Sequence, residues 1–319
     1  MMIGYTLMTE QAGPRALVEH AVHAERAGFD FEVISDHYSP WLVEQGHAPN
    51  AWAVLGAIAQ ATERVRLMTY VTCPTMRYHP TVVAQQAATV QLLSDNRFTL
   101  GLGAGENLNE HVVGQGWPPV NVRHEMLGEA LEIISRLFNG GHVDFVGRHF
   151  RVDSAKLWDL PEQRVPVGVA VSGPQSVELF APSADAMIAV EPDADLCRQW
   201  RKAAPDADRI IGQLPVCFDR DELAAVVRAH EQFRWFGGGW KVNSELPGPP
   251  AFAGATQFVR PEDVAASIPC GPEVKPIVEA VAKFQDAGFT DVALVQIGGD
   301  HQREFLDFAR EELLPALRA

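Results

Sequence analysis

An acid, an imidazole and an indole follow one short apolar run of the sequence. Asp36, His37 and Trp41 come at or just after the end of "FEVIS" (31–35), and Glu106 follows a second apolar run that ends in "GLGAG". An imidazole, whose ordinary pKa is about 6.5, can take or give a proton near neutral pH. These residue types therefore indicate acid–base chemistry. Taken singly, they also suit a turn cap or ordinary packing, so the functional interpretation requires that they converge.

Two further apolar runs end in residues that could contact a ligand. Thr72 and Cys73 end one run, and Ser172, Gly173 and Pro174 end another, just before a predicted helix. The free amides at the start of a helix can hold an anion. A plain turn capped by the serine is the alternative that the sequence leaves open.

Eight apolar, β-rich runs alternate with amphipathic segments along the chain. Because these runs are nearly continuous, we expect a parallel sheet that is covered on both faces. Eight strands with helices between them predict an α/β fold, a (β/α)8 TIM barrel, whose strands share one mouth at their carboxyl ends. A doubly wound sheet is the alternative. The predicted strands are 2–7, 31–35, 65–73, 97–105, 165–172, 184–191, 210–218 and 291–298.

Residues 1–319 are expected to form a single barrel domain with two insertions. Residues 140–164 indicate a short hairpin-like excursion. Residues 236–272 are rich in Gly and Pro and cannot form one helix or one strand. A long irregular segment between the last two strands would lie over one barrel mouth, where loops of that length are often lids.

The glycines of "GLGAG" do not complete a nucleotide-binding motif. Gly101, Gly103 and Gly105 lack the next glycine of the dinucleotide fingerprint, because position 106 is Glu. We expect instead that these small residues let a flat ring approach the backbone closely. The sequence has no P-loop, no serine-hydrolase elbow and no metal-binding spacing of His and carboxylates, so we expect no metal site.

The composition argues against two classes of partner. The formal net charge is −15 at pH 7, so the chain repels nucleic acid and anionic membrane surfaces. Its apolar runs are far shorter than the roughly 18–20 residues that cross a bilayer, and its start does not resemble a secretion signal. The 4 cysteines have no C-x-x-C spacing, which fits a reducing compartment, and we expect a cytoplasmic protein.

Six parts of the sequence together resemble the luciferase-like flavin and deazaflavin oxidoreductases, in particular the branch of the F420-dependent glucose-6-phosphate dehydrogenases. The resemblance spans nearly the whole chain. Its most specific part is the pairing of S-D-H…W with G-x-G-x-G-E-x-L-N-E. The parts are "SDHYSPW" (35–41), "VTCPTMRYHP" (71–80), "NRFTLGLGAGENLNEH" (96–111), "GRHF" with "LWDLP" (147–161), "SGP" (172–174) and "GGDHQREFL" (298–306).

The resemblance implies a TIM barrel, usually a homodimer, with coenzyme F420 in the barrel mouth. By position, Asp36 and Asn109 would bind the ring or its tail, and a non-prolyl cis peptide between Tyr70 and Val71 would support the back of the ring. Residues 172–174 would lie along the coenzyme phosphate. The implied cofactor-binding positions are Asp36, Tyr70, Val71, Cys73, Gly105, Asn109, Ser172, Gly173, Pro174 and Gln175.

The same resemblance implies hydride transfer, with His37, Trp41 and Glu106 as catalytic residues. A neutral His37 would take the hydroxyl proton of an alcohol while a hydride passes to C5 of the deazaflavin. Trp41 and Glu106 would stabilise the developing charge, or Glu106 would exchange a proton with a ring nitrogen. An FMN-dependent monooxygenase of the same fold and a barrel that binds F420 without turnover are the alternatives.

The sequence departs from the glucose-6-phosphate branch where that branch binds phosphate. Asp193 stands where a Lys is expected, and the stretch "DVAASIPCGP" has no Arg. A phosphate beside Asp193 and Glu191 would be repelled, and Lys241 alone would not replace the missing cations. We therefore expect an F420-dependent dehydrogenase or reductase for an alcohol or carbonyl substrate other than glucose 6-phosphate. A sugar-phosphate dehydrogenase with a rebuilt phosphate site is the alternative.

Overall fold

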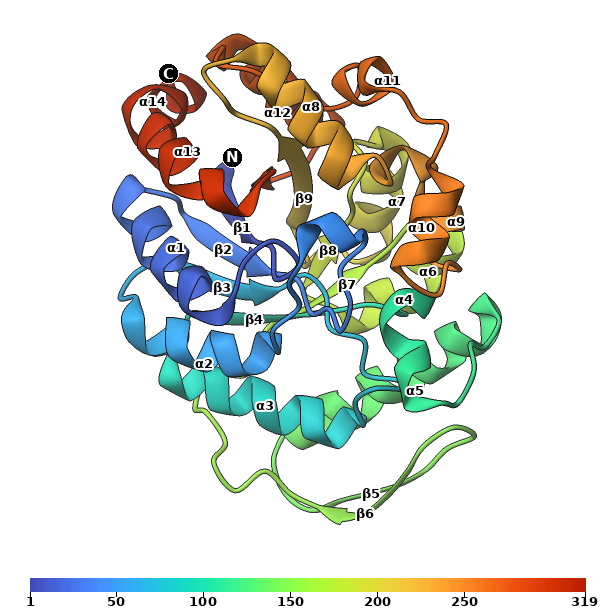
Figure 1. Ribbon diagram of the computed structural model, residues 1–319. Helices are drawn as coiled ribbons and strands as arrows, with labels where there is room; N and C mark the ends of the chain where they lie inside the picture. Colours follow the sequence, from blue (N-terminus) through green and yellow to red (C-terminus); the bar gives the residue numbers. More distant parts are fainter.

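Eight parallel strands close into a barrel in the computed structural model, which describes residues 1–319 (Figure 1). β10 pairs with β1, so the sheet has no free edge. The expected TIM barrel is confirmed, and each predicted strand overlaps one observed strand. In their order around the barrel, the strands are β1 (Met2–Leu7), β2 (Phe31–Ile34), β3 (Arg66–Thr69), β4 (Phe98–Leu102), β7 (Val167–Ala170), β8 (Ala186–Ile188), β9 (Arg209–Val216) and β10 (Asp291–Gln296).

The interior of the barrel is filled by side chains that alternate along the strands. Phe31 and Val33 of β2 share the inner cluster with Met68 and Ile211. Ile34, on the opposite face of β2, belongs to the larger cluster under the helices. Because the inside of the barrel is packed, a ligand site belongs at its mouth, among the loops that follow the strands.

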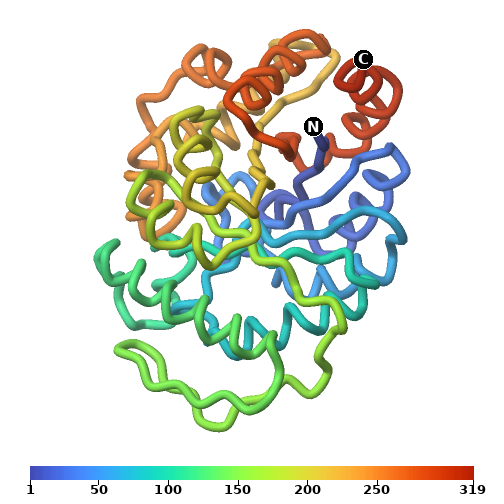
Figure 2. The backbone as a smooth tube through the Cα atoms, turned by 180° about the vertical axis from the view of Figure 1, so that it is seen from behind, coloured from blue at the N-terminus to red at the C-terminus, as the bar shows by residue number.

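Helices surround the barrel and carry the chain back to the start of each next strand (Figures 1 and 2). In α1, Pro14 begins the helix and Gly28 ends it with a φ of 102°. None of the helices combines the length and apolar character needed to cross a bilayer. The helices that surround the barrel or extend its loops are α1 (Pro14–Ala27), α2 (Ala51–Ala61), α3 (Pro80–Leu93), α4 (Asn107–Glu110), α5 (Val120–Phe138), α6 (Pro174–Phe180), α7 (Ala194–Ala203), α8 (Glu222–Phe233), α12 (Val274–Ala287), α13 (Gln302–Phe308) and α14 (Leu314–Arg318).

The two insertions take different forms. Residues 140–164 contain an antiparallel hairpin of β5 (Val143–Val146) and β6 (Arg151–Ala155), which lies apart from the barrel strands at the lower edge of Figure 1. Residues 236–272, here called the β9–β10 segment, form short helices in place of one regular element. These helices are α9 (Trp240–Asn243), α10 (Pro249–Ala255) and α11 (Pro261–Ala265).

The β9–β10 segment is held against loops from other strands. The Glu245 carboxylate accepts hydrogen bonds from Trp117 Nε1 at 3.0 Å and from Arg123 Nη2 at 3.1 Å. Phe252 of the segment is fully buried in a cluster that includes Trp41, which follows β2. The segment therefore joins loops that follow β2 and β4 at one mouth of the barrel.

Candidate active site

His37 lies between two carboxylates just past the carboxyl end of β2. Its Nδ1 is 3.2 Å from Glu10 Oε1, and its Nε2 is 3.0 Å from Glu106 Oε1. The side chains of His37 and Glu10 are 8% and 1% exposed, and that of Glu106 is 13% exposed. Glu10 follows β1, His37 follows β2 and Glu106 follows β4, so three strand ends build this arrangement.

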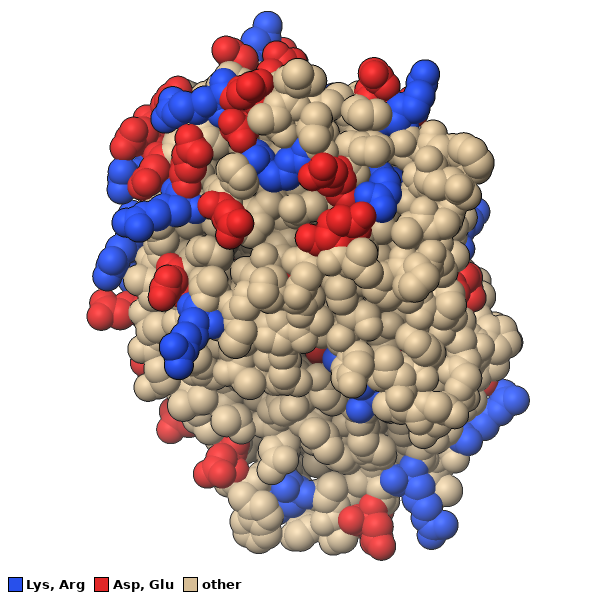
Figure 3. Space-filling model, viewed as in Figure 1, with Lys and Arg blue, Asp and Glu red and all other residues tan.

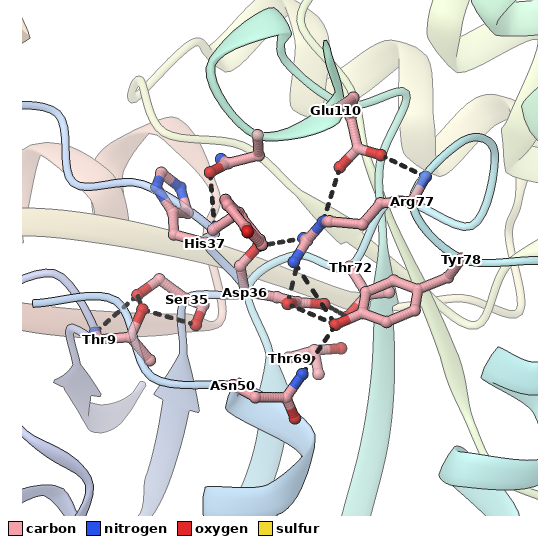
Figure 4. A network of polar contacts seen from close by, with 12 residues as sticks. Thr9, Ser35, Asp36, His37, Asn50, Thr69, Thr72, Arg77, Tyr78 and Glu110 are labelled. Atoms are coloured by element: carbon pink, nitrogen blue, oxygen red, sulfur yellow. Dashed lines mark hydrogen bonds and ion pairs between the residues drawn. The ribbon is translucent and has the colours of Figure 1, made fainter. Parts of the chain in front are cut away.

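Glu10 is a site residue that the sequence reasoning missed. Its Oε2 accepts hydrogen bonds from Ser35 Oγ at 2.5 Å and from Thr9 Oγ1 at 3.1 Å. Figure 4 shows Thr9 and Ser35 side by side below His37, and their hydroxyls bind the Glu10 oxygen that is not the one nearest the imidazole. The sequence did contain a signal for Glu10. Thr9 and Glu10 follow the first predicted strand, so they belong to the same rim of the barrel as Asp36.

The surroundings of His37 favour its protonated form. Burial alone would lower its pKa, but the charges of Glu10 and Glu106 outweigh burial and raise the pKa of His37 to about 9. The expectation of a neutral imidazole at neutral pH is therefore wrong. In the cation both ring nitrogens carry a proton, so His37 starts as a proton donor and becomes a base only after one proton has left.

Trp41 borders the same site on the side of the β9–β10 segment. Its ring centroid is 5.0 Å from that of His37, and it stacks on Trp235 at 4.0 Å with an interplanar angle of 10°. Phe252 meets the indole edge-on at 5.1 Å. The three aromatic rings form a packed apolar wall beside the imidazole. The sequence reasoning did not single out Trp235 or Phe252, which are distant from Trp41 along the chain.

Asn109 fixes the loop that carries His37. Its Oδ1 accepts hydrogen bonds from the backbone N–H groups of Tyr38 at 2.8 Å and Ser39 at 3.2 Å, and its Nδ2 donates to Glu106 Oε1 at 3.1 Å. Glu106 precedes α4, but its side chain does not cap that helix. Glu106 Oε2 is buried without a partner, so one carboxylate oxygen is free to accept a hydrogen bond from a ligand.

Asp36 belongs to a buried polar network (Figure 4). Its Oδ2 accepts a hydrogen bond from Thr72 Oγ1 at 2.6 Å, and its Oδ1 lies 3.2 Å from Arg77 Nη2 and 3.4 Å from the Tyr78 hydroxyl. Arg77 also pairs with Glu110, at 3.4 Å. In this structure Asp36 therefore orients the loop after β3, and its contact with a ring stays a prediction.

The peptide bond between Tyr70 and Val71 is cis, as the family resemblance implied. Beside it, the glycines after β4 leave room for the neighbouring chain. A Cβ on Gly103 would lie 2.6 Å from Val71 Cγ2, and a Cβ on Gly105 would lie 2.5 Å from Cys73 Sγ. The space next to these glycines is thus filled by the segment after β3. The expectation that a flat ring would use that space is wrong, although the same segment can still border a ring on its other side.

The turn after β7 presents fewer free amides than the sequence suggested. Ser176 Oγ accepts hydrogen bonds from the N–H groups of Ser172 at 3.2 Å and Gly173 at 3.3 Å. Pro174 begins α6 and has no N–H. The backbone N–H groups of Gln175 and Ser176 have no acceptor, and they are the donors that remain for an anion at this turn.

The structure thus brings the three predicted catalytic residues together and places the turn 172–175 elsewhere on the same rim. Trp41 and Glu106 both lie next to His37, whereas the turn follows β7, on the far side of β4 from β2 and β3. Chemically, the arrangement holds one mobile proton on an imidazole between two carboxylates, next to an aromatic wall.

Comparisons with known proteins agree with the barrel fold and with the family that the sequence resembles. The model of the luciferase-like monooxygenase family matches residues 1–291. An F420-dependent glucose-6-phosphate dehydrogenase of Amycolatopsis mediterranei (strain U-32) is 34% identical, covering 100% of this chain and 99% of the relative. An F420-dependent hydroxymycolic acid dehydrogenase of Mycobacterium tuberculosis is 35% identical, covering 99% and 88%. The structure of an F420-dependent secondary alcohol dehydrogenase in complex with an F420–acetone adduct has a TM-score of 0.89 and 27% identity, covering 100% and 99%.

Proposed function

Because the chain belongs to the luciferase-like monooxygenase family, we propose, from its F420-dependent relatives, that it is an F420-dependent oxidoreductase. It transfers a hydride between the deazaflavin and an alcohol or carbonyl carbon. The observation that carries this proposal is the placement of His37 between Glu10 and Glu106, beside Trp41, at the mouth of the barrel. The FMN-dependent alternative rests on a more distant likeness of fold, to FMN-containing structures that are 17% and 15% identical.

The residues at the mouth fit a flat ring with polar edges. The unpartnered Glu106 Oε2 would accept a hydrogen bond from such a ring, and the cis peptide between Tyr70 and Val71 would support it from behind. The free N–H groups of Gln175 and Ser176 suit a phosphate on the coenzyme tail. When bound, coenzyme F420 supplies the hydride acceptor and donor that the side chains of the protein lack.

We assign the proton transfer to Nε2 of His37. Of the two carboxylates, Glu106 is the more exposed, at 13% against 1% for Glu10, so a substrate oxygen reaches the imidazole from the side of Glu106. In the reductive direction His37 gives its proton to the carbonyl oxygen, and in the oxidative direction it takes the hydroxyl proton. Glu10 stabilises the cation through Nδ1, while Trp41 shields one side of the imidazole from water.

The rim supports an uncharged substrate, and the likeness to an F420-dependent secondary alcohol dehydrogenase favours a secondary alcohol or its ketone. Glu191 and Asp193 follow β8, and the Asp193 carboxylate caps α7 by accepting from the N–H groups of Asp195 and Leu196. A phosphate at this place would meet carboxylates and no cation of the family type. In Figure 3 charged side chains lie across the upper part of the face and along its edges, and the middle of the face is mostly uncharged.

The test is a titration of the purified chain with F420, followed by a substrate screen read from the coenzyme absorbance. We expect binding of F420 and turnover of secondary alcohols, or of ketones with the reduced coenzyme, but not of glucose 6-phosphate. Turnover of glucose 6-phosphate alone would overturn the substrate class and leave the chemistry intact. Binding of FMN with consumption of oxygen would overturn the proposed function.

A pair of histidine variants tests the assigned role of His37. His37→Ala is expected to bind F420 and to lose about 10²–10⁴-fold in kcat, the usual contribution of a general acid–base residue. His47→Ala removes an exposed imidazole from the same loop and is expected to keep its turnover. Equal loss of turnover in both variants would contradict the assignment.

We also propose that the protein is a homodimer that works in the cytoplasm. Val82, Leu92 and Leu93 leave apolar surface exposed on α3, which a second copy could cover. The cysteines are all free, which suits a reducing compartment. Light scattering is expected to give twice the chain mass of 34.9 kDa, and the double variant Leu92→Glu, Leu93→Glu is expected to give the single mass. A wild-type protein with the single mass would reject the dimer.

A further inference from the structure

Two cysteines away from His37 are paired through their backbones. Cys217 follows β9, and Cys270 lies near the end of the β9–β10 segment. The N–H of Cys217 donates to the Pro269 carbonyl at 2.9 Å, and the N–H of Gly271 donates to the Cys217 carbonyl at 3.0 Å, which forms an isolated parallel bridge. Neighbouring strands lie about 4.7–4.9 Å apart. This spacing falls within the roughly 4.4–6.8 Å that separates the Cα atoms of disulfide partners.

Arg228 of α8 favours a negative charge on this pair. Its Nη1 lies 2.8 Å from Asp219 Oδ2 and its Nη2 donates to the Phe218 carbonyl at 2.7 Å, while its Nε is buried without an oxygen acceptor. The neighbouring Cys270 thiol lowers the pKa of Cys217, and Arg228 lowers it further against the effect of burial. The same interaction raises the pKa of Cys270. Arg228 therefore favours the thiolate, the reactive form of a cysteine, at Cys217 over Cys270.

The other two cysteines lack these features. Cys73 and Cys197 are each buried without a second thiol, and burial raises the pKa of both, to about 11 for Cys197. Cys270 is the one cysteine of the chain that is partly exposed, so a small oxidant in solution can reach it. A second thiol, a neighbouring guanidinium and access from solvent thus coincide only at Cys217 and Cys270.

We propose that Cys217 and Cys270 form a reversible redox site whose disulfide fastens the end of the β9–β10 segment to the barrel. The oxidant is a small organic disulfide, RSSR. Cys270 passes its proton to the Cys217 thiolate, and the Cys270 sulfur attacks RSSR, which forms a mixed disulfide and releases one thiolate, RS⁻. Cys217 then loses this proton, and its sulfur attacks the Cys270 sulfur and displaces the second RS⁻. The two cysteine sulfurs are oxidised, RSSR is reduced by two electrons, and the single proton ends on one of the two released groups, which gives RSH and RS⁻.

The disulfide acts on the part of the segment that borders the active site. Cys217 and Ile268 share a buried cluster with Trp41 and Phe252. A covalent link at Cys270 would join this part of the segment to the strand directly, in addition to its two backbone hydrogen bonds. Local opening of the segment, which begins where packing is weakest, would then be suppressed in the oxidised form.

The test uses the full-length protein with oxidised glutathione and needs neither coenzyme nor turnover, so it does not depend on the proposed function. Digestion and mass spectrometry are expected to give one cross-linked pair of peptides, which contains Cys217 and Cys270 and disappears with dithiothreitol. Titration of the unfolded protein is expected to find that oxidation removes two of the 4 thiols. Hydrogen exchange in residues 259–272 is expected to be slower in the oxidised form.

Matched cysteine variants complete the test. Cys270→Ser is expected to form no internal link, whereas Cys197→Ser is expected to form it as the wild type does. The peptide map of the wild type keeps the test decisive even where a variant folds poorly. A mixed disulfide that persists at Cys270, a link that involves Cys73 or Cys197, or unchanged exchange in residues 259–272 would each overturn the proposal.

Discussion

At the scale of single residues, the charge on His37 sets the direction in which a proton moves. Below a pH of about 9 the imidazole is a cation held by Glu10 and Glu106, and it can give a proton at once. Carbonyl reduction therefore starts from the resting form of the site, whereas alcohol oxidation first requires that a proton leave. The same pair of carboxylates that fixes the ring thus also biases its chemistry.

A pH profile tests this bias. The rate of alcohol oxidation is expected to rise with pH toward about 9, and the rate of carbonyl reduction to fall over the same range, because neutral and cationic His37 serve the two directions. Glu10→Gln removes one stabilising charge, so it is expected to move the oxidation profile about 1–3 pH units lower. Glu279→Gln, at an exposed position of α12, is the control that should leave the profile in place. Profiles that coincide for wild type and Glu10→Gln would refute the bias.

The buried carboxyl of Glu32 predicts a separate dependence of stability on pH. Glu32 is 1% exposed, both of its oxygens lack a partner, and burial raises its pKa well above the usual value. Burial in the folded state therefore favours the protonated carboxyl of Glu32. Protonated Glu32 makes its full contribution to the free energy of unfolding below a pH of about 4.3, the pKa of a glutamate in the unfolded chain. This contribution is lost as the pH rises through the higher pKa of Glu32 in the folded state.

Replacement of Glu32 by a neutral side chain tests that reading. Glu32→Gln is expected to unfold at a higher temperature than the wild type at pH 8, and the gap is expected to close near pH 4. The exposed Glu63→Gln is the matched control, with no such gap. Thermal unfolding followed by circular dichroism gives the comparison, and a wild type that is more stable than Glu32→Gln at pH 8 would count against it.

Sequence position predicted which residues meet at the site, but it did not predict their charges or their partners. His37, Trp41 and Glu106 could be singled out because each follows a strand, and parallel strands end at one mouth. The cation on His37 could not be foreseen, since it depends on Glu10, which follows a different strand. The contacts of Trp235 and Phe252 with Trp41 could not be predicted either. Trp235 follows α8 and Phe252 lies in the β9–β10 segment, and the sequence of this part of the chain has no regular pattern.

At the scale of elements, the packing of Phe252 against Trp41 holds the β9–β10 segment in place. It is fully buried, so Phe252→Ala is expected to destabilise the segment by about 3–5 kcal/mol, the usual range for a core phenylalanine. Limited proteolysis is expected to cut residues 236–272 faster, and KM is expected to rise as the wall loosens. Phe258→Ala in the same segment removes an 85% exposed ring and should change neither measurement. Equal cleavage of the two variants would show that Phe252 is not the anchor.

The glycine of β4 shows how closely two neighbouring strands approach. A Cβ on Gly101 would lie 2.0 Å from the Thr69 carbonyl oxygen, so Gly101→Ala is expected to lower the free energy of unfolding by roughly 1–3 kcal/mol or more. Gly128→Ala, in α5 with nothing within 4 Å, is expected to raise it by roughly 0.5–1 kcal/mol. Denaturant unfolding of both variants gives the measurement. A neutral Gly101→Ala would mean that β3 and β4 can separate without loss.

The elements themselves were largely predictable, because buried parallel strands leave a clear apolar pattern. The run 291–298 contains β10, and the helix before it ends at Gly288 as a left-handed C-cap requires. The short helices of the β9–β10 segment were not predictable, since stretches of four to seven residues with Gly and Pro carry no period. The prediction for Gly101, Gly103 and Gly105 was wrong for a related reason. The space beside these glycines is filled by β3 and the residues after it, which the sequence around the glycines does not show.

At the scale of the whole molecule, the net charge of −15 acts on every anionic ligand that approaches the mouth. With saturating coenzyme, kcat/KM for an alcohol that carries a negative charge remote from its hydroxyl is expected to increase as salt is raised from 0.01 M to 0.1 M, because the Debye length falls from about 30 Å to about 10 Å. An uncharged secondary alcohol is the control and should show no such increase. An anionic alcohol that turns over more slowly with added salt would indicate a local cationic site.

The stacked indoles of Trp41 and Trp235, 4.0 Å apart, also have an optical consequence. Two identical chromophores held so near each other couple electronically, so the pair should contribute its own band to the near-ultraviolet dichroism. One of the two indoles borders the imidazole at 5.0 Å, so anything that enters beside His37 and tilts that indole should alter this band. The chain thus carries an intrinsic reporter of site occupancy that requires no dye and no coloured substrate.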